Sequence, residues 1–398
     1  MSESIPMRAS ATIRPFEPDD RRAFLSLYET VFDRERSVDW FQWRYEDNPY
    51  VDHVPIVVAE DDGDVVGCRA FFALEAHVEG TEQLAFQPCD TMVHPDYRGQ
   101  GLFSRMNAFA VDRYTDGEPA FCFNFPNENS KPGNLKHGWK EIGTFPVYYR
   151  PQDPVGSVAK LTNDDHDADE TRADGDEWVD GDTGLGVDRD LPADIDASVG
   201  DEDGVVDTLA SLVTSSQQAG DRLVTDSTDE FAVVRFETPP AELLESVYRR
   251  SVPDGIHTNR TAEFYRWRFG NPARSYTAYV VTRDGETPVA ALVTSRVDDY
   301  LRIVETLPRE IDAEAEAIDR LLATALADRG NRNYVTAFGE TLPSPIQYRF
   351  YPDTRFPLST LIQPTARTLL ARDLGDGVGV ERTDADDWSL SRLDLDTT

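Results

Sequence analysis

Two glycines, Gly99 and Gly101, lie in the stretch V-H-P-D-Y-R-G-Q-G-L-F-S-R-M, which runs from Val93 to Met106. Because glycine has no Cβ atom, this turn can adopt positive φ and let a ligand approach the backbone closely. Successive amide N–H groups that lead into a helix form a site for an anion, and the helix dipole adds partial positive charge. The pattern predicts a turn that binds phosphate or pyrophosphate, with an ordinary tight turn as the alternative.

The residues on either side of this turn predict a strand followed by a helix. Leu84 to Met92 is an apolar run typical of a buried strand. Apolar residues after the turn recur at helical spacing, namely Leu102, Met106, Phe109, Ala110 and Tyr114. A P-loop would need Gly-Lys-Ser/Thr here, and a dinucleotide-binding fold would need a third glycine and an early βαβ unit. The chain has neither pattern.

A second segment of interest follows the predicted helix. Asn127, Ser130, Asn134, Lys136, Gly138 and Trp139 occur within thirteen residues, and three of the four lysines of the chain lie between Lys131 and Lys140. In a chain that otherwise avoids lysine, this local cluster suits a phosphate group. The alternative is a solvated helix face.

These two segments resemble the GCN5-related N-acetyltransferase (GNAT) superfamily. In that family, motif A (Q/R-x-x-G-x-G/A) holds the pyrophosphate of acetyl-CoA, and Gly99 and Gly101 match its two glycines. Asp96 stands where the family usually has Gln or Arg, with Arg98 nearby. Motif B (N-x-x-A/S-x-x-x-Y-x-K-x-G-F) fits the spacing from Asn127 to Trp139. The resemblance implies the α/β acyl-CoA N-acyltransferase fold, built on a mixed sheet.

The resemblance also implies acetyl-CoA as acyl donor, an amine as acceptor and no metal. The cofactor-binding residues that it implies are Met92, Val93, Arg98, Gly99, Gln100, Gly101, Leu102, Phe103, Asn127, Ser130, Asn134 and Lys136. Asn134 departs from the pattern, because it replaces the tyrosine that usually protonates the leaving thiolate. Since an amide cannot serve as that acid, another group or solvent must do so, or this part of the chain binds the cofactor without catalysing.

Acyl transfer to an amine needs a base, and a backbone N–H near Met92 to His94 would polarise the thioester carbonyl. The candidate bases are Asp90, His94 and Glu128, which flank the expected site. Each has a structural alternative, as a strand-end, surface or helix-start residue respectively. Tyr148 and Tyr149 are candidate acids, although packing in the core or on the surface explains both tyrosines better.

The elements around this site follow the order expected of the GNAT fold. A strand over residues 10–15 precedes a helix with apolar residues from 24 to 32, and two strands at 56–59 and 65–73 form a hairpin. The strand over 84–92, the glycine turn and the helix follow. Residues 120–125 and 145–150 predict further strands, the last of which would close this lobe.

The second half of the chain repeats part of the first. The stretch from Phe264 to Pro272, F-Y-R-W-R-F-G-N-P, resembles F-Q-W-R-Y-E-D-N-P from Phe41 to Pro49, and each copy precedes a pair of predicted strands. This similarity predicts an internal duplication. After the predicted strand at 301–307, however, the second copy has an acidic helix start and no glycine turn. Because acidic residues there would repel a pyrophosphate, the second lobe should not bind CoA.

The charge pattern separates the two halves. Between Asn163 and Asp207 there are 18 Asp or Glu against two Arg, about -16 of the formal net charge of -35. This segment contains too few apolar residues to form a core. The predicted organisation is therefore an N-terminal GNAT lobe at 10–150, an acidic and largely disordered linker at 151–230, a degenerate GNAT-like lobe at 231–372, and an acidic tail at 373–398 that forms a possible edge strand.

Composition limits the cellular setting and the partners. The acidic, lysine-poor composition is typical of a protein from a salt-adapted, halophilic organism, and it argues against nucleic-acid or anionic membrane partners. Cys68, Cys89 and Cys122 have no metal-ligand spacing and fit a reducing cytoplasm. We find neither a membrane-spanning run nor a signal-peptide pattern and expect a cytoplasmic monomer or homodimer.

The function that these patterns favour is an acyl-CoA-dependent N-acyltransferase, a tandem GNAT protein that acetylates an amine of a small molecule or of a protein. Two alternatives stay open at this point. One is an acetyl-CoA-binding sensor with weak catalysis, consistent with Asn134. The other is an aminoacyl-tRNA-dependent transferase of the tandem-GNAT type, although the acidic surface argues against a tRNA partner.

Overall fold

The computed structural model describes residues 11–115, 117–126, 130–152, 231–283, 287–297, 300–309, 315–328, 334–356, 358–361, 367–375 and 377–396. The elements of the N-terminal part are β1 (Thr12–Pro15), α1 (Arg21–Phe32), α2 (Val38–Phe41) continued by a π-helical turn (Gln42–Glu46), β2 (Ile56–Asp61), β3 (Asp64–Val78), β4 (Thr81–Val93), α3 (Leu102–Thr115), β5 (Phe121–Asn124), α4 (Lys131–Lys136), β6 (Lys140–Phe145) and β7 (Val147–Pro151). This order confirms the predicted succession of strand, helix, hairpin, strand, turn and helix.

The second part of the chain repeats the pattern. Its elements are β8 (Phe231–Phe236), α8 (Ala241–Tyr248), β9 (His257–Thr258), α9 (Ala262–Phe269), β10 (Tyr276–Arg283), β11 (Thr287–Val297), β12 (Tyr300–Leu307), α10 (Ala315–Asp328), β13 (Tyr334–Phe338), α11 (Ser344–Gln347), β14 (Tyr351–Pro352), α12 (Leu358–Leu361) and β15 (Arg367–Asp373). The acidic segment predicted to be disordered falls outside the described residues.

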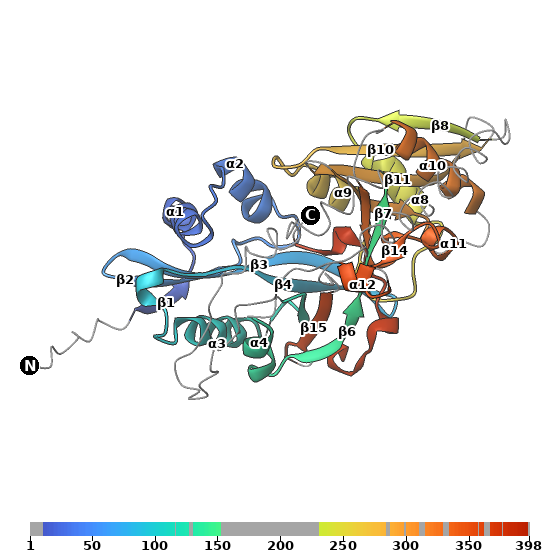
Figure 1. Cartoon of the computed structure of the whole chain (residues 1–398). Helices are drawn as coiled ribbons and strands as arrows, with labels where there is room; N and C mark the ends of the chain where they lie inside the picture. Colours follow the sequence, from blue (N-terminus) through green and yellow to red (C-terminus); the bar gives the residue numbers. More distant parts are fainter. Residues whose placement is uncertain are drawn as a thin grey trace, which may run out of the picture.

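The strands form two sheets that exchange one strand each. The first has the order β1-β2-β3-β4-β5-β15-β6, with β9 paired to β3, and the second has the order β14-β7-β13-β12-β11-β10-β8. In Figure 1 the green β7 lies among the yellow and orange strands, and the red β15 lies beside β5 and β6. We therefore correct the expectation that residues 145–150 close the first lobe. After Phe145, the last residue of β6, the chain leaves the first sheet, and β7 joins the second sheet between β13 and β14. A strand from the C-terminal part, β15, lies between β5 and β6 in the first sheet.

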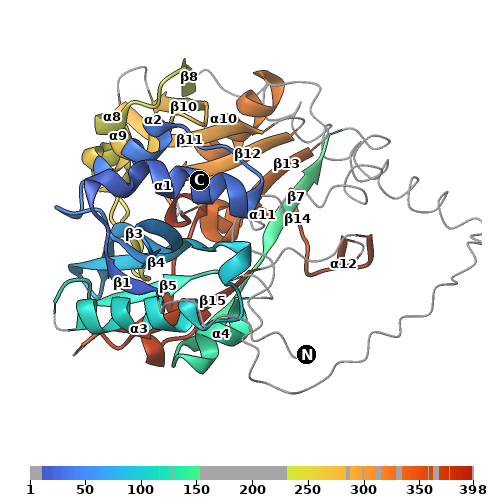
Figure 2. The same ribbon diagram turned by 90° about the vertical axis from the view of Figure 1, so that its left-hand side faces the viewer.

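Helices cover both faces of the first sheet. Figure 2 shows α1 and α2 on one side of β3 and β4, with α3 and α4 on the other. The α3 side is apolar because Leu102, Met106, Ala110 and Tyr114 share one face of that helix and pack on the sheet. Being covered on both sides, β3 and β4 are buried along most of their length. No helix within the described part combines the length and apolar character needed to cross a bilayer.

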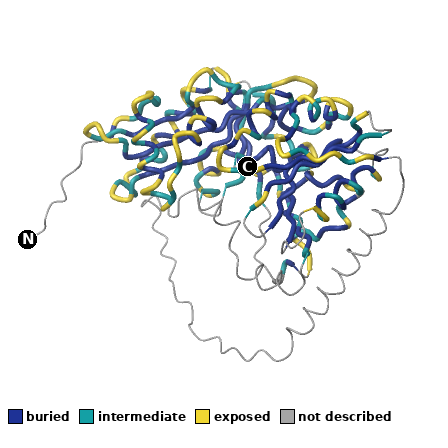
Figure 3. The backbone as a smooth tube through the Cα atoms, turned by 90° about the horizontal axis from the view of Figure 1, so that it is seen from above, coloured by how far each residue is buried: buried dark blue, intermediate teal, exposed yellow. Residues whose placement is uncertain are grey.

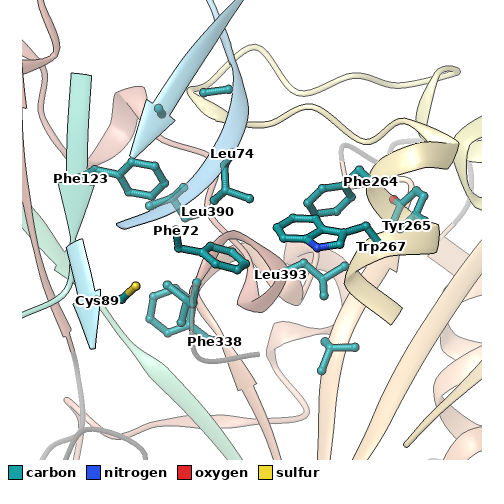
Figure 4. Packing of buried hydrophobic residues seen from close by; sticks show 14 of the residues in the cluster. Phe72, Leu74, Cys89, Phe123, Phe264, Tyr265, Trp267, Phe338, Leu390 and Leu393 are labelled. Carbon is teal, nitrogen blue, oxygen red and sulfur yellow. The ribbon is translucent and has the colours of Figure 1, made fainter. Parts of the chain in front are cut away.

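The two repeated aromatic segments meet where the lobes join. The indole Nε1 of Trp43 donates to the carbonyl oxygen of Trp267 at 2.6 Å, and Nε1 of Trp267 donates to the carbonyl oxygen of Trp43 at 2.8 Å. Phe72 stacks on Trp267 (Figure 4), with ring centroids 5.0 Å apart. The guanidinium groups of Arg44 and Arg268 lie 4.9 and 5.0 Å from the centroid of the Phe72 ring. This reciprocal contact and the matching strand orders support an internal duplication.

The C-terminal tail passes through the junction between the lobes. We predicted a possible edge strand here, but Val380–Arg382, Ala385–Asp387 and Arg392–Asp394 form short 3-10 turns, and the only bridge described is between Ile256 and Trp388. The apolar residues of the tail, Trp388, Leu390, Leu393 and Leu395, are at most 2% exposed. In Figure 3 the C-terminal end of the chain lies near the centre of the view. The alternating leucines therefore mark a central core segment rather than a sheet edge.

Candidate functional site

The candidate site begins where β4 and β5 diverge. These parallel strands are paired only at Ala85–Phe121 and Phe86–Cys122, although β4 continues to Val93 and β5 to Asn124. We call the diverging backbone of residues 87–93 and 123–124 the β4–β5 wedge. Asn124 is 8% exposed, and its side-chain oxygen has no hydrogen-bond partner in the described part of the chain. Because a buried acceptor without a donor is costly, this end of β5 suits a ligand that carries an N–H group.

A β-bulge shapes β4 beside the wedge. The register with β3 shifts between Cys68–Met92 and Ala70–Cys89, so that two residues of β4 face Arg69 alone. Asp90 takes the left-handed conformation, with φ of 42°, at this bulge. Bulges of this kind redirect side chains and occur frequently next to active sites.

The end of β4 offers one amide to the wedge. The N–H of His94 donates to the carbonyl oxygen of Val66 at 2.8 Å and so points toward β3. Because amides alternate in direction along a strand, the N–H of Val93 points away from β3, toward the wedge, and that of Met92 points toward β3. Within the predicted range Met92 to His94, Val93 is therefore the residue placed to polarise a carbonyl group.

The glycine turn lies directly after β4. Gly99 and Gly101 both have φ of 71°, and a Cβ atom at either position would meet no protein atom within 4 Å. α3 begins at Leu102, and the N–H of Arg105 donates to the carbonyl oxygen of Gly101 at 3.1 Å. The turn therefore has the backbone conformation, the open space and the helix N-terminus that an anion-binding nest requires.

The motif B segment packs beside this turn. Phe103 in the first turn of α3 lies 6.0 Å from the ring of His137, and Ser104 is within hydrogen-bond distance of the same imidazole at 3.4 Å. Gly138 ends the segment with φ of 89°, and Trp139 is buried among the residues under α3. The structure therefore brings the two sequence motifs together.

The charged and polar residues of motif B take different positions. Asn134 is 3% exposed, Ser130 precedes α4, and Lys136 is exposed to solvent. Lys131 pairs with Glu141 at 2.9 Å. Asn127 and Glu128, a predicted ligand and a predicted base, lie outside the described residues. Arg98 and Gln100 turn toward the loop itself, where they donate to the carbonyl oxygens of Val93 at 3.5 Å and Asp96 at 3.2 Å.

The predicted bases and acid lie in three different environments. Asp90 is buried on the α1–α2 side, where it accepts hydrogen bonds from Arg44 at 2.8 Å and from the hydroxyl of Tyr45. His94 is half-buried and accepts from the N–H of Asp96 at 3.3 Å. Tyr149 lies on β7 in the second sheet, packed 6.0 Å from Tyr334, because β7 has left the first sheet. The base role of Asp90 and His94 and the acid role of Tyr149 stay predictions.

Sequence reasoning missed one residue of this site, Asp396, which lies in the C-terminal tail. Asp396 pairs with Arg44 at 3.2 Å, and its N–H donates to the side-chain oxygen of Gln87 on β4 at 2.8 Å. Burial raises the pKa of Asp396, and the charge of Asp90 raises it further, against the opposing effect of Arg44. The repeated Trp-Arg-aromatic segment was the sequence signal for Arg44, but nothing in the sequence indicated that residue 396 would meet it.

The second lobe has a matching wedge that is filled. β12 and β13 are paired only at Leu301–Val335 and Arg302–Thr336. The tail bridges the diverging ends: Arg309 donates to the carbonyl oxygen of Ser389 at 2.7 Å, and the N–H of Glu340 donates to that of Leu390 at 2.8 Å. The predicted acidic helix start at 310–314 lies outside the described residues. The filled wedge is a separate reason to expect no CoA in this lobe.

Comparisons with known proteins agree with this geometry. Residues 12–140 match the family model described as an acetyltransferase (GNAT) domain. A GNAT protein from Anabaena variabilis superposes with a TM-score of 0.57 at 9% identity over 92% of this chain and 73% of its own. A probable N-acyltransferase of unknown function from Enterococcus faecalis gives 0.58 at 10% identity over the same shares. A GNAT protein from Kribbella flavida gives 0.54 at 14%, over 92% and 72%. No curated protein matches the chain significantly.

These matches define a class of protein. Residues 12–140 match a GNAT acetyltransferase domain, and the chain as a whole has the GNAT fold, with a second sheet of the same strand order. Proteins of this family use acyl-CoA. The fold prediction made from the sequence is thereby confirmed, including the mixed sheets.

Proposed function

We propose that this protein is an acyl-CoA-dependent N-acyltransferase that transfers an acetyl group to an amine of a small molecule or of a protein. The observation that carries the proposal is the open glycine turn, where Gly99 and Gly101 present backbone amides at the N-terminus of α3 beside the β4–β5 wedge. Such a nest is suited to a pyrophosphate. The match of residues 12–140 to an acetyltransferase domain supports the same function.

Each residue around the β4–β5 wedge has a separate role in the proposed reaction. Gly99 and Gly101 hold the pyrophosphate, and the unpartnered oxygen of Asn124 accepts an N–H from the pantetheine arm. The N–H of Val93 stabilises negative charge on the thioester oxygen when the amine attacks. Asp90 and Asp396, held by Arg44, are carboxylates that can accept the proton lost by the amine.

The experiment that tests the cofactor assignment is a calorimetric titration with acetyl-CoA. We expect wild type to bind and Gly99→Asp to bind roughly 100-fold more weakly, because the new carboxylate repels the pyrophosphate and displaces its amide contacts. Gly80→Asp is the matched control. Gly80 also has positive φ, 81°, with no atom near a Cβ, but it lies in the β3–β4 hairpin at the opposite end of β4. Equal weakening in both variants, or no binding by wild type, would remove the assignment.

Binding without turnover is the second candidate function, and Asn134 favours it. Asn134 stands where the family usually has the tyrosine that protonates the leaving thiolate. Because Asn134 is buried, a solvent molecule cannot easily reach this position and supply the proton instead. Release of free CoA thiol, measured with a panel of small amines and peptides, separates the two candidates. A transferase releases thiol only when an acceptor is present, whereas a sensor binds acetyl-CoA and releases none.

A further inference from the structure

The second lobe contains a cavity of about 450 Å³. Its walls come from the residues after β8, the loop before β10 and the ends of β11 and β12. The volume falls in the range of about 300–1,000 Å³ that is typical of small-molecule sites. None of the residues of the proposed acyl-CoA site lines it. The cavity is therefore a separate feature of the second lobe.

Positive charge gathers at this cavity in a chain whose formal net charge is -35. Arg274 and Arg296 line it. Burial and the charge of nearby Arg302 together lower the pKa of Arg274 to about 10, with Tyr276 opposing. One carboxylate, Glu237, also lines the cavity, but it is already paired with Arg235. An anion in the cavity would relieve the mutual repulsion of the arginines.

One buried group that lines the cavity has a polar atom without a partner in the described part of the chain. Tyr276 lines the cavity and is 6% exposed, and its hydroxyl has no hydrogen-bond partner in the described part of the chain. Buried polar groups are nearly always hydrogen-bonded, so such exceptions point to a missing acceptor.

We propose that this cavity binds a small organic anion that carries a carboxylate or phosphate group. The guanidinium group of Arg274 and the hydroxyl of Tyr276 hold the oxygen atoms, because a guanidinium fork matches both kinds of oxyanion. Phe269 and Leu301 supply apolar surface for the carbon skeleton. This site is independent of acyl-CoA binding and stands or falls separately from the proposed function.

The test uses the full-length protein and fluorine NMR of trifluoroacetate, with succinate and inorganic phosphate as competitors at constant ionic strength. We expect saturable line broadening in wild type, a Kd about tenfold higher in Arg274→Gln and several-fold higher in Tyr276→Phe. Arg249→Gln, which removes an equal charge from an exposed pair with Glu245 on α8, is expected to stay within about twofold of wild type. Circular dichroism and the acetyl-CoA titration show whether each variant is folded.

Competition identifies the oxyanion. Displacement by succinate at lower concentration than phosphate supports a carboxylate ligand, and the reverse supports a phosphate ligand. The proposal is overturned if wild type shows no saturable broadening, if Arg274→Gln keeps the wild-type Kd, or if chloride displaces the probe as well as either oxyanion does. Tyr276→Phe, which keeps the aromatic ring, keeps the test decisive should Arg274→Gln fail to fold.

Discussion

Asp394→Asn is expected to lower the free energy of unfolding by about 3–5 kcal/mol, because it removes one partner of a buried charge network. Asp394 is fully buried and accepts from the guanidinium group of Arg260 at 2.8 and 3.1 Å. It also accepts from the N–H of Thr258 at 2.8 Å and from the hydroxyl of Ser391 at 2.9 Å. The amide keeps the shape of the carboxylate but leaves Glu305 as the one carboxylate paired with Arg260 among the described residues.

Chemical denaturation followed by circular dichroism measures this loss. Asp112→Asn is the control, since Asp112 is an exposed residue on α3 and its replacement is expected to change stability by less than about 0.5 kcal/mol. If Asp394→Asn were as stable as Asp112→Asn, the network would not hold the tail in place.

The same carboxylate predicts how stability depends on pH. Burial would raise the pKa of Asp394, but the charges of Arg260 and Arg309 outweigh it and hold the pKa well below its usual value. Because the folded pKa lies below the unfolded value of about 3.9, the contribution is fully present above that pH and is lost as pH falls below it. Wild type should therefore lose stability more steeply than Asp394→Asn between about pH 4 and pH 2. Parallel acid denaturation curves would contradict this assignment.

Trp267→Ala is expected to cost about 3–5 kcal/mol, the usual range for removing a buried tryptophan. The indole stacks on Phe72 at 5.0 Å and on Trp43 at 6.0 Å, and its N–H satisfies the carbonyl oxygen of Trp43. Trp267→Phe keeps much of the ring contact and loses only the donor, so we expect a smaller cost of about 1–3 kcal/mol. Both costs follow from denaturation curves.

The reciprocal hydrogen bonds between Trp43 and Trp267 also predict how the effects of two substitutions combine. Trp43→Ala should cost about as much as Trp267→Ala, and the double variant should cost less than the sum, with a coupling of about 0.5–3 kcal/mol. Because β7 and β15 exchange between the sheets, each variant should still unfold in one transition. Additive costs, or two separate transitions, would show that the lobes are not joined at this pair.

Much of the N-terminal lobe could be predicted from local sequence. The apolar periodicity of Leu102, Met106 and Ala110 located α3, and the spacing of Gly99 and Gly101 located the turn before it. These features are local, since a glycine conformation or a helix face depends on residues a few positions apart. The duplication was visible for the same reason, because a repeated nine-residue segment is a property of the linear chain.

The exchange of strands could not be predicted in this way. Residues 145–150 were predicted as a strand and Arg367–Asp373 was not, and nothing in a strand's own residues specifies which of two similar sheets it will join. The partner is decided by the tertiary path of the chain. For this reason Tyr149 was assigned to the first site and lies in the second sheet.

The sequence by itself determined the class of fold, the glycine turn before α3 and the presence of two related halves, because each depends on short-range spacing of glycine and apolar residues. Only the tertiary structure decided what surrounds that turn. It placed Arg44 between Asp90 and Asp396, residues separated by some three hundred positions, and it laid the tail across the wedge of the second lobe. Contacts of such sequence separation are set by the packing of the whole chain, which no local pattern encodes.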